Sequence, residues 1–159
     1  MRQPWLSSQE RSMGVLDWHW RIRRYWLLLS QGAAEKIWIK SSRYRLILQC
    51  QSKTSMLRSW LDSQGWRIAE ERVLKEGRFL YTVMEVWWQP DHARLEPGEC
   101  WFPAALLENP SDQVPAYFAW VKKGLEITLA HQADAEKQTA LDYLNALAAN
   151  PDLSFLTEV

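Results

Sequence analysis

The chain has 159 residues, 47% of them hydrophobic, which is enough for one domain with a buried core and excludes global disorder. Basic and acidic residues number 19 each, so the formal net charge at pH 7 is zero. The first 58 residues nevertheless carry eleven of the basic residues against three acids, which favours either steering of a polyanion to this end or two differently composed solvated surfaces.

The cysteines and the apolar runs limit the class of protein further. Cys50 and Cys100 have no CxxC motif and no histidine at ligand spacing, which argues for a reducing compartment and against structural zinc. The start lacks the apolar core of a signal peptide, and the apolar run at residues 25–29 is too short to span a bilayer. We therefore expect a cytoplasmic protein with no membrane segment and no metal.

The stretch LDWHWRIRRYW, residues 16–26, is unusually rich in tryptophan, and five of the eleven tryptophans lie in the first 38 residues. On a strand, Trp18 and Trp20 would share one face and stack on nucleic-acid bases, while Arg21, Arg23 and Arg24 would bind phosphates. The apolar spacing that follows predicts a helix over residues 22–31, with Gly32 as its C-terminal stop.

Strand, helix and strand follow, which is typical of an α/β unit. YRLILQ, residues 44–49, has the short apolar pattern of a strand buried on both faces. A helix is expected within residues 52–64, ending at Gly65 and capped by Thr54 or Ser55. Its apolar positions at helical spacing are Met56, Leu57, Trp60 and Leu61.

Residues 66–88 predict an antiparallel hairpin that turns at KEG, residues 75–77. Trp66, Phe79 and Tyr81 are expected in the core, because aromatic residues at strand period are usually buried. Glu70 and Glu71 would point to opposite faces of the strand, so they cannot share a catalytic site and are expected on a polar hairpin face.

A proline-containing loop over residues 89–103 should lead to helices that extend to residue 149. Pro115 fits a first helical turn after Ser111 or Asp112 as cap, and a long helix or an antiparallel pair is expected. The apolar positions that repeat at steps of three and four are Val114, Phe118, Val121, Leu125 and Leu129, then Ala140, Leu141, Leu144 and Leu147.

Catalytic motifs are absent from the sequence: it has no GxGxxG, GxxxxGK[ST], HExxH or GxSxG. His19, His92 and His131 share no metal spacing and are expected to be surface or loop residues rather than bases. Lys122 and Lys123, near an aromatic pair at 117 and 120, would bind phosphate while a ring stacks, or would simply lie on a solvated helix face.

Residues 43–86 carry a longer ordered pattern: LILQ, then LRSWLDSQGW, then IAEERVLKEGRFLYTV. They resemble the last strands of the bacterial tRNA (adenine-N1)-methyltransferases that use S-adenosylmethionine to modify the adenine at tRNA position 22. The matching positions are 46–49, 57–61, Gly65, Trp66, Glu71, Gly77, Tyr81 and Val83. The segment FPAALLENPSDQVPAYFAWVKKGLE is similar to the start of the family's helical extension. The resemblance therefore covers residues 27–130. Within it, Cys50 stands where the family has proline.

The resemblance implies an α/β fold: the C-terminal half of a Rossmann-like class I methyltransferase sheet that ends in an antiparallel hairpin, then an α-helical appendage that helps to hold tRNA. The implied division is an atypical N-terminus at 1–21, a partial Rossmann-like domain at 22–88, a loop at 89–103 and the appendage at 104–149. Gln49 and Cys50 would border the cleft, because ligands of open α/β sheets collect at the carboxyl ends of strands. No catalytic residue is assigned.

Two family features are missing from the sequence. No cofactor loop resembling DxGSDHxxLP occurs, and DWHWR at 17–21 stands where the family has Gly-Met-Gly-Gly or Gly-Ile-Gly-Gly. Read one nucleotide later, the codons of DWHW give Ile or Thr, Gly, Ile or Thr, and Gly. This suggests that residues 1–21 are a frameshift product without a selected fold.

We therefore expect a chain that lacks the N-terminal half of the enzyme, does not bind S-adenosylmethionine alone and is inactive alone. One alternative is a non-catalytic tRNA-binding or RNA-binding module, and another is a non-functional fragment whose exposed sheet edge causes aggregation.

Overall fold

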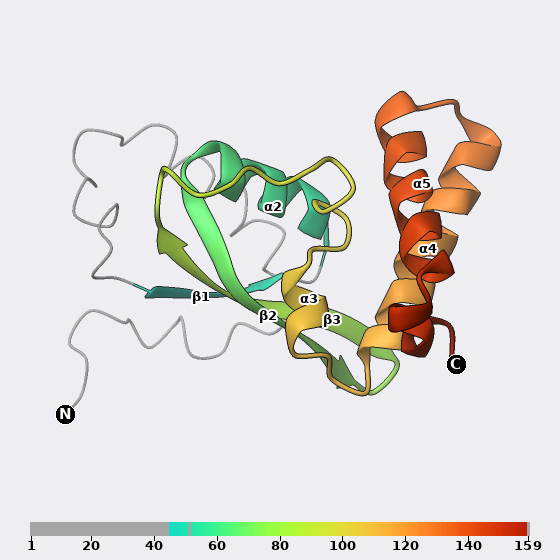
Figure 1. Ribbon diagram of the computed structural model, residues 1–159, viewed down its shortest axis with the longest axis horizontal. Helices are drawn as coiled ribbons and strands as arrows, with labels where there is room; N and C mark the ends of the chain where they lie inside the picture. Colours follow the sequence, from blue (N-terminus) through green and yellow to red (C-terminus); the bar gives the residue numbers. More distant parts are fainter. Residues whose placement is uncertain (1–44, 51, 159) are drawn as a thin grey trace, which may run out of the picture. The chain divides into compact units, whose positions relative to one another are not determined.

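The computed structural model describes residues 45–50 and 52–158 (Figure 1). The N-terminal stretch, the helix predicted at 22–31 and the candidate residues Arg21, Arg23 and Arg24 lie outside the described residues. The elements, in chain order, are β1 (Arg45–Cys50), α2 (Thr54–Ser63), β2 (Trp66–Glu76), β3 (Phe79–Trp88), α3 (Ala105–Glu108), α4 (Val114–His131), α5 (Ala135–Ala149) and the 3₁₀ helix η3 (Pro151–Thr157).

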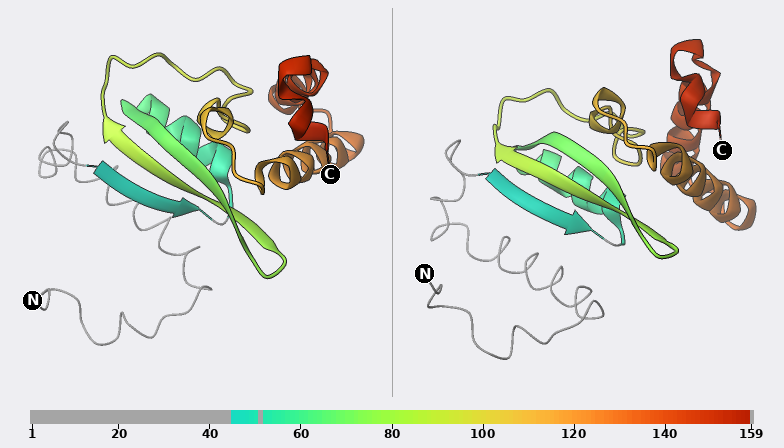
Figure 2. Two further views of the ribbon diagram at one scale, coloured as in Figure 1. Left: turned by 60° about the horizontal axis from the view of Figure 1, so that its bottom comes forward. Right: turned by 90° about the horizontal axis from the view of Figure 1, so that it is seen from below.

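The three described strands form one sheet in the order β1, β3, β2. Both outer strands run antiparallel to β3, so β1 and β2 run parallel to each other with β3 between them. Figure 2 shows α2 along one face of this sheet. The predicted strand is confirmed, but its burial on both faces is wrong. Ile47, on the face opposite α2, is 64% exposed, because no described element covers that face of β1.

The hairpin is confirmed, with Gly77 and Arg78 as its two-residue turn and Glu76 paired with Phe79. Gly77 has φ 59, a left-handed conformation that glycine adopts without steric cost. Trp66 and Tyr81 are buried as predicted. Phe79 is 59% exposed, contrary to prediction, because it lies beside the turn, beyond the elements that cover the sheet.

Both ends of helix α2 are set by residues with a left-handed backbone conformation, Lys53 before it and Gly65 after it. The predicted side-chain cap is wrong: the helix starts after Lys53, which has φ 55, and no side chain caps it. The predicted stop is confirmed, since Gly65 has φ 82 and its N–H donates to the Asp62 carbonyl at 3.1 Å. Met56 is exposed, and the buried residues of α2 are Leu61 and, unexpectedly, Arg58.

Residues 89–104 form neither helix nor strand, and α4 and α5 then pack side by side as an antiparallel pair (Figure 1). Pro115 lies in the first turn of α4 as predicted, but Ser111 does not cap this helix; its hydroxyl donates to the Val73 carbonyl at 3.2 Å. Asp134 caps α5 by accepting from the Lys137 N–H. Helix η3, after residue 149, was not predicted.

One hydrophobic core joins the hairpin to the helices. Val73 of β2 packs with residues of the loop and of α3, α4, α5 and η3. The buried members of the core are Val73, Phe102, Leu106, Val114, Tyr117, Phe118, Val121, Leu125, Ala140, Leu144 and Leu156. The far end of the hairpin is therefore anchored to the helical appendage, which we define as residues 105–157.

Candidate functional site

The carboxyl end of β1 is the edge of the sheet where the sequence predicts the cleft. Cys50 is 1% exposed, pairs in register with Thr82, and its Sγ donates to the Ser52 carbonyl at 3.0 Å. Gln49 pairs with Val83 and, because side chains alternate along a strand, lies on the other face. The two predicted cleft residues are thus adjacent in sequence but do not share one surface, and their role stays a prediction.

The connection from β1 to α2 does not fit a glycine-rich cofactor loop. The described glycines are Gly65, Gly77, Gly98 and Gly124, and none of them lies in this connection. The left-handed position there is filled by Lys53, the one non-glycine residue with positive φ in the described part of the chain. Among its described residues, this connection therefore has no glycine-rich turn.

Behind this edge lies a buried charge network that sequence reasoning missed. Arg58 of α2 is 0% exposed and binds both carboxylate oxygens of Glu71, with Nε to Oε2 at 3.1 Å and Nη2 to Oε1 at 2.7 Å. Its other N–H groups donate to the Tyr117 hydroxyl at 3.2 Å and to the carbonyls of Cys100 and Trp101 at 2.9 and 3.0 Å. All five guanidinium donors are satisfied.

Burial and charge act in opposite directions on this guanidinium. Burial by itself would lower the pKa of Arg58, but the charge of Glu71, with the hydrogen bonds that Arg58 donates to Glu71 and Tyr117, outweighs it and raises the pKa. Arg58 is therefore a permanent buried cation with a paired counter-ion. It joins α2, β2, the 89–104 loop and α4, and so fixes the appendage to the sheet.

The prediction for the two glutamates was half right. Glu70 and Glu71 do face different environments, because Glu70 pairs with exposed Arg72 at 2.6 Å. Glu71, however, is 1% exposed and does not lie on a polar surface. A register shift between Ile68 and Glu70 sets which side chains of β2 face α2, and such an irregularity is not visible in the sequence.

A second contact that the sequence did not reveal ties the loop to the end of α2. His92 has 6% of its side chain exposed, with Nε2 2.8 Å from Asp62 Oδ1 and Nδ1 2.6 Å from the Gln89 carbonyl. Asp62 also accepts from the Leu95 N–H at 3.2 Å and lies beside Arg94. His92 is a loop residue as predicted, yet it is largely buried and paired, which gives it a structural rather than a catalytic environment.

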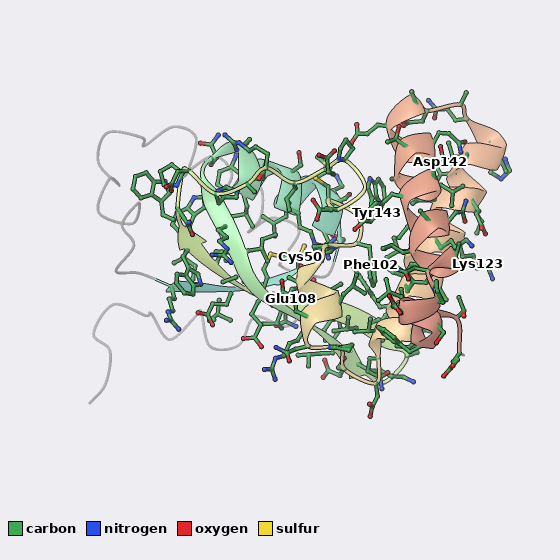
Figure 3. All side chains as sticks on the ribbon, in the orientation of Figure 1. Cys50, Phe102, Glu108, Lys123, Asp142 and Tyr143 are labelled. Carbon is green, nitrogen blue, oxygen red and sulfur yellow. The ribbon has the colours of Figure 1, made fainter. Side chains whose placement is uncertain are left out.

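The loop contacts α5 through Tyr143 (Figure 3). A Cβ placed on Gly98 would lie 2.2 to 2.6 Å from atoms of the Tyr143 side chain, so only glycine fits here. Burial, with a smaller effect of Glu99, raises the pKa of Tyr143 to about 12. Burial, with the charge of Asp62, likewise raises the pKa of the Cys100 thiol, which makes it a poor nucleophile.

The predicted phosphate-binding group on α4 is not one surface. Tyr117 is buried in the Arg58 network, Lys122 is half-buried and Lys123 is exposed. Trp120 is 59% exposed, and its ring lies 5.8 Å from that of Tyr117. Lys123 points away from the sheet in Figure 3. Lys122 and Lys123 therefore stay a prediction, and of the two rings near them only that of Trp120 is exposed.

Neither a metal site nor a membrane span is found in the part of the chain that the structure describes. Across residues 45–50 and 52–158, no three His, Cys, Asp or Glu side chains are placed to hold a metal ion together. None of the described helices has the length and apolarity needed to cross a membrane.

A protein-family model described as tRNA (adenine(22)-N(1))-methyltransferase matches residues 34–146. No curated protein sequence matches the chain.

Solved structures share the fold at low sequence identity. An uncharacterized protein from Listeria monocytogenes serotype 4b is 19% identical, with a TM-score of 0.54 over 82% of this chain and 55% of that one. A proposed tRNA (m1A22) methyltransferase from Streptococcus pneumoniae, in complex with S-adenosyl-L-methionine, is 22% identical, with a TM-score of 0.54 over 87% of this chain and 54% of that one. The chain thus spans about half the length of these relatives, and the predicted fold class, a partial Rossmann-like α/β sheet with a helical appendage, is confirmed.

Proposed function

The chain belongs to the tRNA (adenine(22)-N(1))-methyltransferase family, and we propose on this premise that it supplies the closing strands and the helical appendage of an enzyme that methylates an adenine of tRNA. The observation that carries the proposal is the family match over residues 34–146, which spans the sheet, the loop and both long helices. The methyl donor would be S-adenosylmethionine, as in the family.

We further propose that these 159 residues do not transfer a methyl group by themselves. Methyl transfer requires the sulfonium of the cofactor and the accepting adenine nitrogen to be held in line. The described residues hold no glycine-rich loop at the carboxyl end of β1, and the sequence has none resembling that of the family. A chain that cannot hold the cofactor cannot align the two reactants.

The test is a methyl-transfer assay with tritiated S-adenosylmethionine and an unmodified tRNA transcript carrying adenine at position 22. The chain alone should incorporate no label, and calorimetry should show no cofactor binding at micromolar concentration. Addition of a polypeptide with the N-terminal half of a family member should restore incorporation. A transcript with guanine at position 22 is the matched control and should stay unlabelled.

If the chain alone incorporates label and this depends on adenine 22, the proposed inactivity is disproved. The proposed methyltransferase role is then supported. No incorporation even with the added half would argue against the enzymatic role. It would then favour the second candidate, a tRNA-binding module without chemistry.

Arg21, Arg23, Arg24, Lys122 and Lys123 remain the proposed phosphate contacts from the sequence. Charge-neutralising glutamine variants, compared by gel shift over a salt series, would test them, because each lost phosphate contact lowers the salt dependence of binding by about one unit of slope. The frameshift hypothesis for residues 1–21 is tested separately by resequencing the DNA from upstream of the first codon through codon 40.

A further inference from the structure

The hairpin extends beyond the end of β1. The last register pair of β1 is Cys50 with Thr82, so residues 74–81 form a ribbon of two described strands (Figures 1 and 2). Thr82 and Phe79 are three residues apart, which places the hairpin end about 10 Å past the end of β1. We call residues 74–79 the hairpin tip.

The hairpin tip exposes large apolar side chains. Phe79 is 59% exposed and Leu74 is 46% exposed. The guanidinium of Arg78 lies over the Phe79 ring, 5.1 Å from its centroid. On a protein surface, an exposed ring next to a guanidinium is the arrangement on which unpaired bases stack.

The charges around the tip leave two cations without an acidic partner. Glu70 is paired with Arg72, Glu71 is buried with Arg58, and Glu76 accepts a hydrogen bond from the Tyr81 hydroxyl, which raises the pKa of Tyr81. Among the described residues, no carboxylate forms an ion pair with Lys75 or Arg78. Glu76 is the one carboxylate within the tip, so the tip has a net positive charge.

The appendage has the opposite charge. Residues 105–157 have three lysines against seven acidic residues, and one of those lysines, Lys137, is paired with Asp134. A polyanion is therefore attracted to the hairpin tip and repelled by most of the appendage surface.

We propose that the hairpin tip is an RNA-binding surface, on which an unpaired base stacks on Phe79 while Arg78 contacts a flanking phosphate. Lys75, which pairs with Leu80, lies on the other face of the hairpin and contributes only to the positive charge of the tip. The inference rests on the proposed function, because it names the surface through which the chain contacts tRNA. Since β1 and β2 are parallel, both carboxyl ends lie at the edge of the sheet that the tip extends, and ligands of α/β sheets collect at that edge. The tip is exposed there and complementary in charge to the RNA backbone.

The test measures the affinity of the full chain for an unmodified tRNA transcript by fluorescence anisotropy at several salt concentrations. Phe79→Ala should weaken binding about tenfold, since a stacked base contributes on the order of 1–3 kcal/mol. Phe79→Trp, the matched aromatic variant, should bind as the native chain does. Arg78→Gln should lower the salt slope by about one unit, whereas Lys75→Gln, on the other face of the hairpin, should lower it less.

Lys123→Gln, the same type of change on the acidic appendage, separates this inference from the proposed function. If native binding is present and Lys123→Gln weakens it while Phe79→Ala and Arg78→Gln do not, the tip is not the RNA surface and the proposed function stands. If the native chain alone binds no tRNA, the inference about the tip is overturned, whereas the proposed function is decided by the methyl-transfer assay with the added half. If Phe79→Ala instead lowers self-association in sedimentation without changing RNA affinity, the tip is a protein contact and the inference is overturned.

Discussion

The hydroxyl of Tyr117 on α4 accepts a hydrogen bond from Nη2 of Arg58 on α2, at 3.2 Å, across the boundary between the sheet and the helical appendage. The same guanidinium holds Glu71 of β2 and two carbonyls of the loop. A single buried cation therefore sets how the appendage is attached. If the appendage holds tRNA, this attachment also sets where the tRNA lies relative to the sheet.

Removing the Glu71 carboxylate from the Arg58 network should lower the stability of the protein. Glu71→Ala leaves the Arg58 guanidinium buried without a partner charge, and we expect the free energy of unfolding to fall by about 3–5 kcal/mol. Urea denaturation followed by circular dichroism measures the loss. Tyr117→Phe removes one hydrogen bond and should cost about 1 kcal/mol. The paired variant Arg58→Met with Glu71→Leu removes both charges and should cost less stability than Glu71→Ala. It should not restore full stability, because the Cys100 and Trp101 carbonyls lose their donor. A loss below 1 kcal/mol for Glu71→Ala would show that the pair is not buried as described.

Gly98 should not tolerate a side chain. Gly98→Ala places a Cβ within 2.6 Å of the Tyr143 side chain, and we expect a loss of about 1–3 kcal/mol. Combining it with Tyr143→Gly, which removes every side-chain atom that the added Cβ would meet, should relieve the clash, so the two changes should be non-additive in a double-mutant cycle measured by urea denaturation. Additive losses would mean that the loop does not pack on α5 here.

The Thr82 hydroxyl is buried and has no hydrogen-bond partner in the described part of the chain. Thr82→Val keeps the shape and removes the unsatisfied group, so thermal denaturation should show stability unchanged or raised by about 1 kcal/mol. Thr82→Ser keeps the hydroxyl and deletes a methyl group, and should lower stability by about 1 kcal/mol. A Val variant less stable than the Ser variant would reveal a partner for the hydroxyl.

The Asp134 cap of α5 should make the free energy of unfolding fall as the pH is lowered. Hydrogen bonds from the side chain and the backbone N–H of Lys137 lower the pKa of Asp134. A carboxyl with a lowered folded-state pKa contributes stability above its unfolded pKa, near 4, and loses it as the pH falls through the folded value. The native chain should therefore exceed Asp134→Asn in stability at pH 7, and the difference should vanish at a pH below the folded-state pKa of Asp134. An equal difference at both pH values would mean that the carboxylate charge plays no part.

Much of the fold was accessible from local patterns. The hairpin at 66–88, the helix that stops at Gly65 and the periodic faces of α4 and α5 were predicted, because each depends on residues close in sequence. The errors came where burial depends on distant elements. Phe79 fits the strand period but lies past the covered part of the sheet, and Ile47 is apolar yet lies on the face opposite α2.

The candidate site shows the same division. Gln49 and Cys50 were placed correctly at the end of a strand, but the structure puts their side chains on opposite faces. Glu71 was expected on a polar hairpin face and Arg58 was not singled out, because 13 positions separate them and nothing local marks either as buried. Asp62 and His92, 30 positions apart, were missed for the same reason.

The sequence by itself determined the family and the order of the elements. Both follow from the order of strand, helix and hairpin residues along the chain, which does not depend on tertiary contacts. Only the tertiary structure decided which charges are buried together and which aromatic side chains stay exposed. The physical reason is that the α2 face of β2 is selected by a register shift and by the close approach of α2 and α4, and both arise from contacts between residues far apart in the chain.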